Sequence, residues 1–271
     1  MSQGGVMRQA GRLLVLVLLC GLSLQLYFAA RIALMNVVDP QSTSFQRSEM
    51  VRVLREQGRI LWSQEWVPGS RISDQLRRAV IASEDAGFVD HSGVEWDALQ
   101  SAWRKNSAAK ARADKAAQAQ QARYERAVAR AQARGRTPPP PPAANPVTPK
   151  VIGGSTITQQ LAKNLFLSSE RNLLRKGQEF AITFMLEGLL SKGRILDIYL
   201  NNVEWGEGVF GAQAAARHYF GVDAAQLAPR QAARLAVMLP APKRFEKSPA
   251  SGYIVSRSGT IVARMGGAEI P

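Results

Sequence analysis

The chain has 271 residues, 46% of them hydrophobic, which is enough to bury one core of ordinary domain size and excludes a wholly disordered protein. Lys plus Arg (35) exceed Asp plus Glu (21), leaving a net charge of +14. This excess predicts an anionic partner: phosphate-rich lipid, nucleic acid or an acidic polymer. The one cysteine, Cys20, excludes an intrachain disulfide and a cysteine-rich zinc site, so any bound metal would have oxygen ligands.

The first predicted element is a membrane-spanning helix. An uncharged apolar run from Leu13 to Ala30 is long enough to cross a bilayer, and it extends to Met35 if the charged end of Arg31 reaches the interface. The run is longer than most signal-peptide cores, which favours an uncleaved anchor over residues 13–35. A signal peptide cleaved after the small residues that end the run is the alternative.

Two arginines, Arg8 and Arg12, precede this run. Because positively charged flanks tend to stay in the cytoplasm, residues 1–12 are expected there, and everything after about Met35 is expected to be exported. The sequence therefore predicts a single-pass protein of the cytoplasmic (inner) membrane, with its main domain on the outer, periplasmic side.

The chain after the anchor divides into a linker and a helical domain. Residues 36–70 mix short alternating stretches with turn residues and are expected to form an extended or strand-poor linker. From Ile72 onward, apolar residues recur at helical spacing, and no long β alternation competes. The fold class is therefore mainly α, with one domain over residues 71–271. The spacing is carried by Ile72, Leu76, Ala79 and Val80, then by Ile157, Leu161 and Leu165, and then by Leu173, Phe180, Phe184 and Leu189.

A basic insert interrupts this domain at about residues 105–150. Residues 104–136 are rich in Ala, Gln and Arg, which favours a helix, whereas Pro138 to Pro142 must leave it as a stiff extended spacer. Two interpretations stay open: a solvated charged helix with its linker, or a patch that holds anionic lipid headgroups. Nucleic acid is not expected as a partner, because an exported domain rarely meets any.

A glutamate at the end of the first predicted helix is the first candidate for chemistry. Leu76 and Val80 are followed four residues later by Glu84, so this carboxylate projects from the face that is buried. Burial raises the pKa of a carboxylic acid and suits it to proton transfer near neutral pH. A capping or salt-bridging glutamate is the alternative. Further along the same string, EDAGFVDHSG, stand Asp85, Phe88 and His91.

The segment GGSTITQQLAKN, residues 153–164, predicts a second helix with a polar face. Its two glycines permit close backbone approach, and Ser155 or Thr156 can serve as the N-cap. The apolar residues would face the core and leave amides on the opposite face to grip a polar ligand. An ordinary amphipathic helix explains this spacing but not the density of amides. The polar residues are Gln159, Gln160, Lys163 and Asn164.

A cluster of charged residues follows. Glu179 lies four residues after Arg175 and three after Lys176, so all three share one helix face. They can be ordinary helical ion pairs. Together with Lys163 and Arg171, the cations would also neutralise a diphosphate, and two separated glutamates beside them would suit a catalytic cleft.

Four strings, in this order, resemble the blocks of the peptidoglycan glycosyltransferase family, the lysozyme-like transglycosylase module of bifunctional penicillin-binding proteins. They are EDAGFVDHSG, GGSTITQQLAKN, RKGQE (175–179) and KGRILDIYLN (192–201). The likeness covers about residues 72–245. LPAPKRFEKSP (239–249) is similar to the fifth block of monofunctional members, and the residues that follow are too few for a transpeptidase domain. The resemblance implies a lysozyme-like glycosyltransferase domain that follows one transmembrane helix.

The resemblance implies an activity and its partners. The protein is expected to polymerise lipid II into glycan strands, by an inverting transfer that releases polyprenyl diphosphate. Lipid II, the growing glycan strand and membrane lipids are then its partners, and other cell-wall synthases are an open alternative. The resemblance identifies no cofactor that is required for certain, and a divalent cation stays an open alternative.

Residue by residue, the same resemblance implies roles. Glu84 takes the place of the family's general base, which deprotonates the acceptor's sugar hydroxyl, and Glu179 that of the second glutamate, on the donor side. The donor diphosphate is matched by Lys163, Arg171, Arg175 and Lys176. The substrate-lining block supplies Ser155, Thr156, Gln159 and Gln160. The residues that shape the motifs are Asp85, Phe88, His91 and Asn164.

Two departures and several rival interpretations accompany this prediction. The insert stands where a short connection is expected, and Asp197 stands where a glutamate is commoner, a change expected to matter little. The GxGxxG string from Gly206 to Gly211 lacks an acidic residue near position 230, so no dinucleotide site is expected. His91 and His218 are too scattered for a zinc site. The rival functions are a membrane-bound lytic muramidase and a non-enzymatic cell-wall scaffold.

Overall fold

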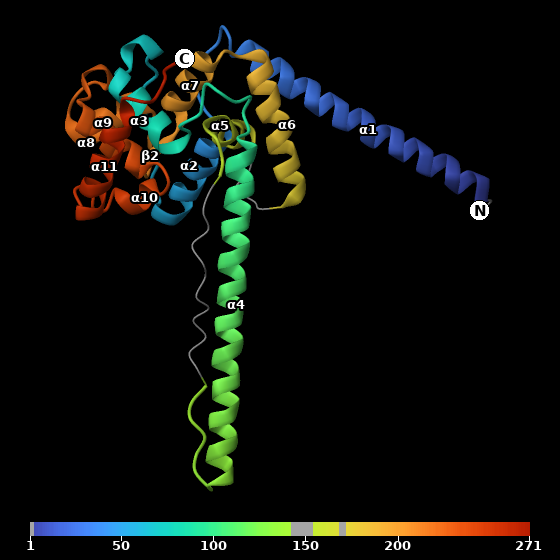
Figure 1. The fold of residues 1–271 in the computed structure, drawn as a ribbon. Helices are drawn as coiled ribbons and strands as arrows, with labels where there is room; N and C mark the ends of the chain where they lie inside the picture. The colour runs from blue at the N-terminus through green and yellow to red at the C-terminus, as the bar shows by residue number, and fades with distance from the viewer. Residues whose placement is uncertain (1–2, 142–153, 168–171) are drawn as a thin grey trace. The chain divides into compact units, whose positions relative to one another are not determined.

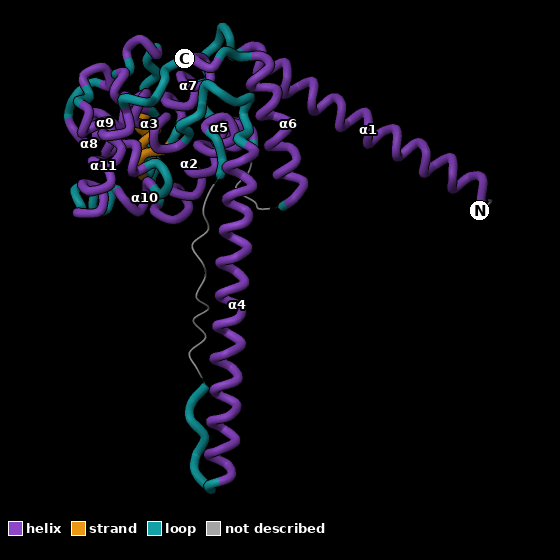
Figure 2. Tube along the Cα trace, viewed as in Figure 1, coloured by secondary structure: helices purple, strands orange, loops and turns teal. Residues whose placement is uncertain are grey.

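The computed structural model describes residues 3–141, 154–167 and 172–271. The chain forms two compact units: unit 1 comprises Met1–Val94 and Thr156–Pro271, and unit 2 comprises Glu95–Ser155. Helices dominate both units (Figures 1 and 2). The mainly α class predicted from the apolar spacing is confirmed.

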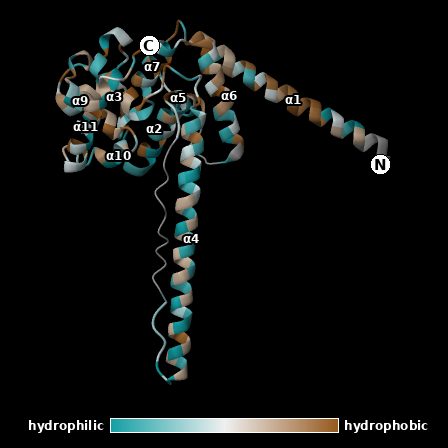
Figure 3. Cartoon of the chain, viewed as in Figure 1, coloured by the Kyte–Doolittle hydropathy of each residue, from teal (hydrophilic) through white to brown (hydrophobic). Residues whose placement is uncertain are grey.

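The first helix, α1 (Gln3–Leu34), combines an exposed apolar stretch with a buried end. Within its segment Met7–Leu34, an 18-residue stretch has a mean hydropathy of 2.3, so the helix is long and apolar enough to cross a membrane; Figure 3 shows its apolar residues in brown. The last turns, unlike the rest of the helix, carry buried side chains, because Phe28 and Ile32 belong to the core of unit 1. The carboxyl end of α1 is therefore packed into the core of unit 1, to which the helix belongs.

The segment after α1 corrects the prediction of a linker over residues 36–70. Its residues Ser44–Gln57 form a helix, α2, whose N-cap Thr43 makes a capping box with Gln46. Gln46 is buried and donates a hydrogen bond of 3.0 Å to the backbone oxygen of Asn202. Polar capping and a buried amide thus fix α2, which explains why apolar periodicity did not reveal it.

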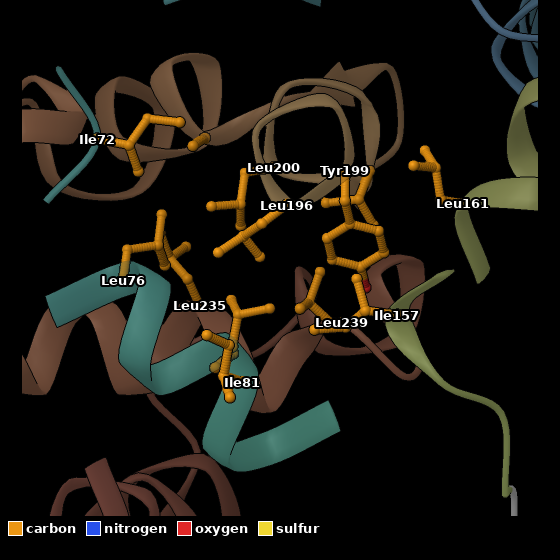
Figure 4. Close-up of a cluster of buried hydrophobic side chains, with 14 of the residues drawn as sticks. Ile72, Leu76, Ile81, Ile157, Leu161, Leu196, Tyr199, Leu200, Leu235 and Leu239 are labelled. Atoms are coloured by element: carbon orange, nitrogen blue, oxygen red, sulfur yellow. The ribbon is translucent and has the colours of Figure 1, made fainter. Parts of the chain in front are cut away.

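The other helices of unit 1 surround one core. They are α3 (Asp74–Glu84), α5 (Ile157–Phe166), α6 (Leu173–Leu189), α7 (Lys192–Asn202), α8 (Ala212–Phe220), α9 (Pro229–Met238), α10 (Pro242–Phe245) and α11 (Gly252–Met265). Side chains of α3, α5, α7 and α9 meet in the core (Figure 4). α3 packs against α9 and α11, whereas α5 packs against α6 and α7.

The helix predicted over residues 173–189 is confirmed as α6, but its apolar residues are not all buried. Phe184 is 49% exposed and Leu189 is 40% exposed. The buried face of α6 carries Ile182 and Leu186 instead. The three-four spacing therefore predicted the helix correctly without identifying its core face.

A small sheet accounts for the glycine-rich string. A Cβ on Gly206 would come within 2.7 Å of the Glu246 carboxylate, and one on Gly211, at φ +81°, within 2.6 Å of the backbone oxygen of Asn201. These glycines therefore allow close packing at a strand turn. The strands, in the order β1–β3–β2, are β1 (Ser63–Gln64), β2 (Glu204–Gly206) and β3 (Val209–Phe210), with β1 and β3 parallel and β2 and β3 antiparallel.

Unit 2 is dominated by one long helix, α4 (Trp96–Ala133). It confirms the helix predicted from the Ala, Gln and Arg content, and it begins several residues earlier than expected. The backbone leaves the helix at Gly135, which has φ +61°, and Pro138 to Pro141 have no regular secondary structure. Pro142 and the rest of the predicted insert up to Lys150 lie outside the described residues.

Candidate active site

Glu84, the last residue of α3, is held by a chain of hydrogen bonds that starts in the core. The side-chain nitrogen Nε2 of Gln160 donates to Glu84 Oε2 at 3.0 Å, and the hydroxyl of Tyr199 donates to Gln160 Oε1 at 2.9 Å. Tyr199 is fully buried, with its ring among the core side chains (Figure 4). Because Tyr199 binds the oxygen of this amide, the amide nitrogen faces the carboxylate.

The surroundings of Glu84 suit a proton acceptor. Burial raises the pKa of Glu84, and this effect outweighs the hydrogen bonds from Gln160 and Ser83, which lower that pKa. The neighbouring charge of Asp85 raises it further. Among the described residues, Glu84 has hydrogen-bond donors but no ion-pair partner. The salt-bridging alternative therefore has no partner within the described residues, and the base role of Glu84 stays a prediction.

Asp85 links the first sequence string to the start of α5. Its Oδ1 lies 2.8 Å from His91 Nε2, and its Oδ2 accepts a hydrogen bond of 2.9 Å from the backbone nitrogen of Ile157. The backbone nitrogen of Gly93 donates to His91 Nδ1 at 3.1 Å, so a neutral imidazole carries its proton on Nε2, facing Asp85. A carboxylate at a helix N-terminus is also electrostatically favourable. Asp85 and His91 thereby position α5 and, with it, Gln160.

The loop that carries His91 lies against α6 as well. Gly93 has φ +83°, and a Cβ there would come within 2.6 Å of Thr183 and 2.8 Å of Glu187. The backbone oxygen of Gly93 accepts a hydrogen bond of 2.6 Å from the hydroxyl of Thr156. The close approach that only glycine allows therefore ties the loop to α5 and α6 together.

Phe88 and Glu187 extend the same connection to α7. Lys192 Nζ lies 4.5 Å from the ring centroid of the buried Phe88 and 2.9 Å from Glu187 Oε1. Glu187 also accepts a hydrogen bond of 2.5 Å from the hydroxyl of Thr158. Phe88 is thus part of the contact between the first loop, α6 and α7, and its shaping role stays a prediction.

The start of α5 differs from the prediction in one respect. Thr156 is the N-cap, and Gln159 closes the capping box with it. Gln159 is only 2% exposed, whereas the sequence placed it on the open polar face, because its amide binds the helix start instead. Ser155 is exposed and is the last residue of unit 2.

Glu179 lies in a charged environment. It is 4% exposed, Arg175 Nη1 lies 3.0 Å from its Oε2, and Lys176 Nζ contacts its Oε1. The helical ion pairs are therefore confirmed. Two cations around one carboxylate still leave a positive charge for an anionic ligand. The Nε of Arg175 is buried and has no hydrogen-bond partner among the described residues.

α5 connects the two glutamate environments. Gln160 contacts Glu84, and Lys163 and Asn164 follow one turn later, where residues three and four apart share a helix face. Lys163 is exposed and Asn164 is half-buried. α5 in turn packs against α6, the helix that carries Glu179 and its cations. Arg171 lies outside the described residues.

Tyr199 and Glu187 are site residues that the sequence reasoning missed. Tyr199 lies in KGRILDIYLN, whose pattern indicates an ordinary buried helix face. The available signal was that a buried tyrosine needs a partner for its hydroxyl, but its identity requires the fold. Glu187 lies outside the quoted strings. The described residues contain no group of three or more His, Cys, Asp or Glu that could hold a metal ion.

Comparison with known proteins assigns the family. The transglycosylase family profile matches residues 52–121 and 144–266. The biosynthetic peptidoglycan transglycosylase of Paraburkholderia xenovorans is 43% identical over 270 residues, which cover 100% of this chain and 97% of the relative. Proteins of the same name from Burkholderia thailandensis and Bordetella pertussis are each 46% identical, over 92% and 86% of this chain and 83% and 82% of the relatives.

The chain therefore belongs to the transglycosylase family, and the lysozyme-like fold and the glycosyltransferase class expected from the four strings are confirmed. The profile match begins inside α2, at a position that the sequence analysis had assigned to a linker. It leaves out residues 122–143, which fall within the basic insert.

Proposed function

We propose that this transglycosylase polymerises lipid II into peptidoglycan glycan strands, by an inverting transfer that releases polyprenyl diphosphate. The relatives named above are biosynthetic peptidoglycan transglycosylases. The observation that carries the proposal is the presence of two environments on helices that α5 contacts: a half-buried carboxylate at Glu84, with no ion-pair partner among the described residues, and a cationic cluster around Glu179 on α6. The first suits proton removal and the second suits a departing diphosphate.

In the proposed step, Glu84 is the general base. Its carboxylate takes the proton of the acceptor's sugar hydroxyl while the oxygen attacks the anomeric carbon of the donor. The bond from that carbon to the diphosphate oxygen breaks on the opposite face, which inverts the configuration. Gln160 holds the carboxylate in place, and the raised pKa of Glu84 makes it a better proton acceptor than a solvated glutamate.

The leaving diphosphate is received by cations. Arg175 and Lys176 are positioned by Glu179, and Lys163 stands one turn beyond Gln160 on α5. In the proposal Lys163 and Arg171 contact the diphosphate directly, and Glu179 keeps the basic pair oriented. In this proposal side-chain cations supply positive charge to the diphosphate, and a contribution from a divalent cation stays open.

We place the reaction at the outer, periplasmic face of the inner membrane. α1 is the candidate span, and its Gln25 exchanges two amide hydrogen bonds, of 2.8 and 3.0 Å, with Gln178 of α6. Gln178 precedes Glu179, so the donor-side cluster lies on a helix fixed to the candidate span. Lipid II and the growing strand are both tethered to the membrane, and a site fixed to the span can meet them. In this proposal membrane lipids are a further partner of the protein, and other cell-wall synthases are an open alternative.

Neither rival function requires both environments. A lytic muramidase also needs a buried glutamate and a glycan groove, but it has no diphosphate to neutralise. A non-enzymatic scaffold needs neither glutamate. The cations gathered at Glu179 therefore favour synthesis over hydrolysis.

The test is incubation of the full chain, in detergent or vesicles, with labelled lipid II. We expect polymeric glycan together with polyprenyl diphosphate, and no release of soluble fragments from finished sacculi. Fragmentation of sacculi without polymer would establish the lytic rival and overturn the proposal. An arm with a metal chelator measures any contribution of a divalent cation. Normal cell-wall function in a Glu84→Gln, Glu179→Gln double variant would establish the scaffold.

A further inference from the structure

The charges of α4 are not spread around the helix. Apart from Lys110, every Lys and Arg of α4 falls within a sector of about 100°, at the ~100° per residue of an α-helix. Of the three acidic residues of α4, Asp114 and Glu125 lie outside that sector by roughly 60° or more, and Asp97 lies within it, in the first turn of the helix. We call this sector the basic stripe; its residues are Arg104, Lys105, Arg112, Lys115, Arg123, Arg126 and Arg130.

The stripe runs straight along the helix. Arg104, Lys115 and Arg126 recur at intervals of 11 residues, as do Arg112 and Arg123. An 11-residue interval drifts by only about 20° over three turns, so the stripe does not wind around α4. The stripe is therefore about 40 Å long, at ~1.5 Å per residue from Arg104 to Arg130.

The stripe is available to a partner. Each of its side chains is exposed, and none makes a hydrogen bond or ion pair within the described parts of the chain. A solvated helix would gain from charges of alternating sign, whereas this one gathers like charges on one face, where they repel each other. That arrangement costs stability unless an anionic surface neutralises it.

We propose that the basic stripe of α4 binds the headgroups of anionic phospholipids. The inference goes beyond the polymerase function and rests on the proposed anchoring of α1, because a chain anchored in a bilayer meets its headgroups at a high effective concentration. A flat anionic surface matches a straight stripe of this length, and each Lys or Arg near such a surface contributes to binding. The sector between the stripe residues holds alanines, such as Ala108, Ala119 and Ala122, so the helix rests on headgroups without inserting.

The test places a spin label on either side of α4. The full chain carrying Cys20→Ser receives one new cysteine, Ala119→Cys inside the stripe or Ala117→Cys outside it. Both are exposed, and both are labelled with a nitroxide. The chains are reconstituted in phosphatidylcholine vesicles, with or without phosphatidylglycerol, that carry a nickel-chelating lipid. Nickel at the headgroups shortens the relaxation time of a nearby nitroxide.

We expect strong relaxation at residue 119 only in vesicles that contain phosphatidylglycerol, weaker relaxation at 117, and loss of the difference at high salt. Lys115→Glu should reduce the effect, whereas the matched change Lys110→Glu, off the stripe, should leave most of it. Equal relaxation at residue 119 with and without phosphatidylglycerol would show that the stripe does not bind anionic headgroups, and it would overturn the proposal. Equal losses in the two variants would also overturn it, because net charge alone would then suffice.

Circular dichroism of each variant confirms that α4 stays helical. Polymerisation of lipid II by the same preparations keeps the two proposals separate. Inactive protein with a normal lipid response counts against the polymerase function alone. Active protein whose label does not respond to phosphatidylglycerol counts against the stripe alone.

Discussion

Glu84 is half-buried and Glu179 is buried, each on a helix that α5 contacts, yet their surroundings are opposite. Glu84 meets the neutral donors Gln160 and Ser83, and burial raises its pKa. Glu179 meets Arg175 and Lys176, which neutralise it. The same side chain is therefore prepared for two tasks: one carboxylate to take up a proton, the other to hold cations in place.

The difference comes from what each helix supplies. Glu84 is the last residue of α3, so no further turn of that helix follows it. Gln160 of α5 donates to its carboxylate, and Tyr199 of α7 donates in turn to Gln160. Glu179 lies inside α6, with its cations one turn earlier on the same helix. A base assembled from several helices depends on the whole fold, whereas an ion-pair cluster on one helix is mostly local.

The largest expected effect is that of Glu84→Gln. Because the variant cannot accept a proton, turnover should fall by at least about a hundredfold while lipid II binding changes only a few-fold. The measurement is the rate of glycan polymerisation beside a lipid II binding isotherm. Glu56→Gln, in an exposed ion pair of α2, is the matched control and should keep wild-type turnover. A Glu84→Gln enzyme with near wild-type turnover would remove Glu84 from the base role.

The same variant should be more stable than the wild type. Because its pKa is raised in the folded state, Glu84 is more easily protonated there than in the unfolded chain. Its contribution to the free energy of unfolding is therefore complete below the unfolded pKa and is lost as pH rises through the folded pKa. Glutamine resembles the protonated acid at every pH. Thermal unfolding should therefore give Glu84→Gln a higher Tm near neutral pH and no advantage in acid.

Glu179→Gln should have the second-largest effect. Arg175 and Lys176 lose the carboxylate that positions them, so we expect kcat/KM for lipid II to fall by roughly tenfold or more. Glu179→Asp keeps the charge and should recover part of the loss. The arrangement of the cations would be irrelevant to the reaction if both variants polymerised at the wild-type rate.

Much of this site could be predicted from sequence because its signals are local. Leu76 and Val80 place Glu84 on the buried face of a helix, and the spacing of Arg175, Lys176 and Glu179 fixes their pairing on α6. Helix spacing depends on residues a few positions apart. A helix face can therefore be recognised from the sequence without knowledge of the fold.

What depends on contacts between helices could not be predicted. The expectation that Asp197 in place of a glutamate matters little stays a prediction, and the sequence did not reveal its surroundings. Its Oδ1 is buried, lies 3.6 Å from Arg77 Nη2 and has no hydrogen-bond partner among the described residues. A Cβ on Gly69 would come within 2.0 Å of the same oxygen. Burial raises the pKa of Asp197. Neither the partner nor the close backbone is visible in the string KGRILDIYLN.

Tyr199→Phe should have a smaller effect that depends on pH. Without the hydroxyl, the amide of Gln160 can rotate and its hydrogen bond to Glu84, which lowers the pKa of Glu84, weakens. The base must be ionised to act, so the acid limb of the pH–rate profile should move to higher pH, with turnover a few-fold lower near neutrality and recovery in alkali.

The control for this variant is Tyr219→Phe. The Tyr219 hydroxyl donates to the backbone oxygen of Trp205 at 2.8 Å, so that variant loses a partly buried hydrogen bond without touching Glu84. Its pH profile should keep the wild-type midpoint. A Tyr199→Phe enzyme that is slower by the same factor at every pH would have a packing defect, and the hydrogen-bond chain would not tune the base.

The smallest expected effect is a change in stability on substitution of a third glutamate, Glu204 of β2. Its surroundings combine features of those of Glu84 and Glu179. Its side chain is buried, and Lys243 Nζ lies 3.7 Å from its Oε1, which has no hydrogen-bond partner among the described residues. Burial raises the pKa of Glu204 to about 7 in spite of this cation. Glu204 therefore combines a neighbouring cation, as at Glu179, with the raised pKa of Glu84.

Because the folded pKa exceeds the unfolded one, the stabilising contribution of Glu204 is complete below the unfolded value and is lost as pH rises through about 7. Glu204→Gln should thus match the wild type near pH 4 and exceed its unfolding free energy by roughly 1–3 kcal/mol near pH 9. Denaturant unfolding at both pH values measures this difference. If the variant is instead less stable in alkali, the attraction to Lys243 outweighs the cost of burial, and Glu204 belongs with Glu179.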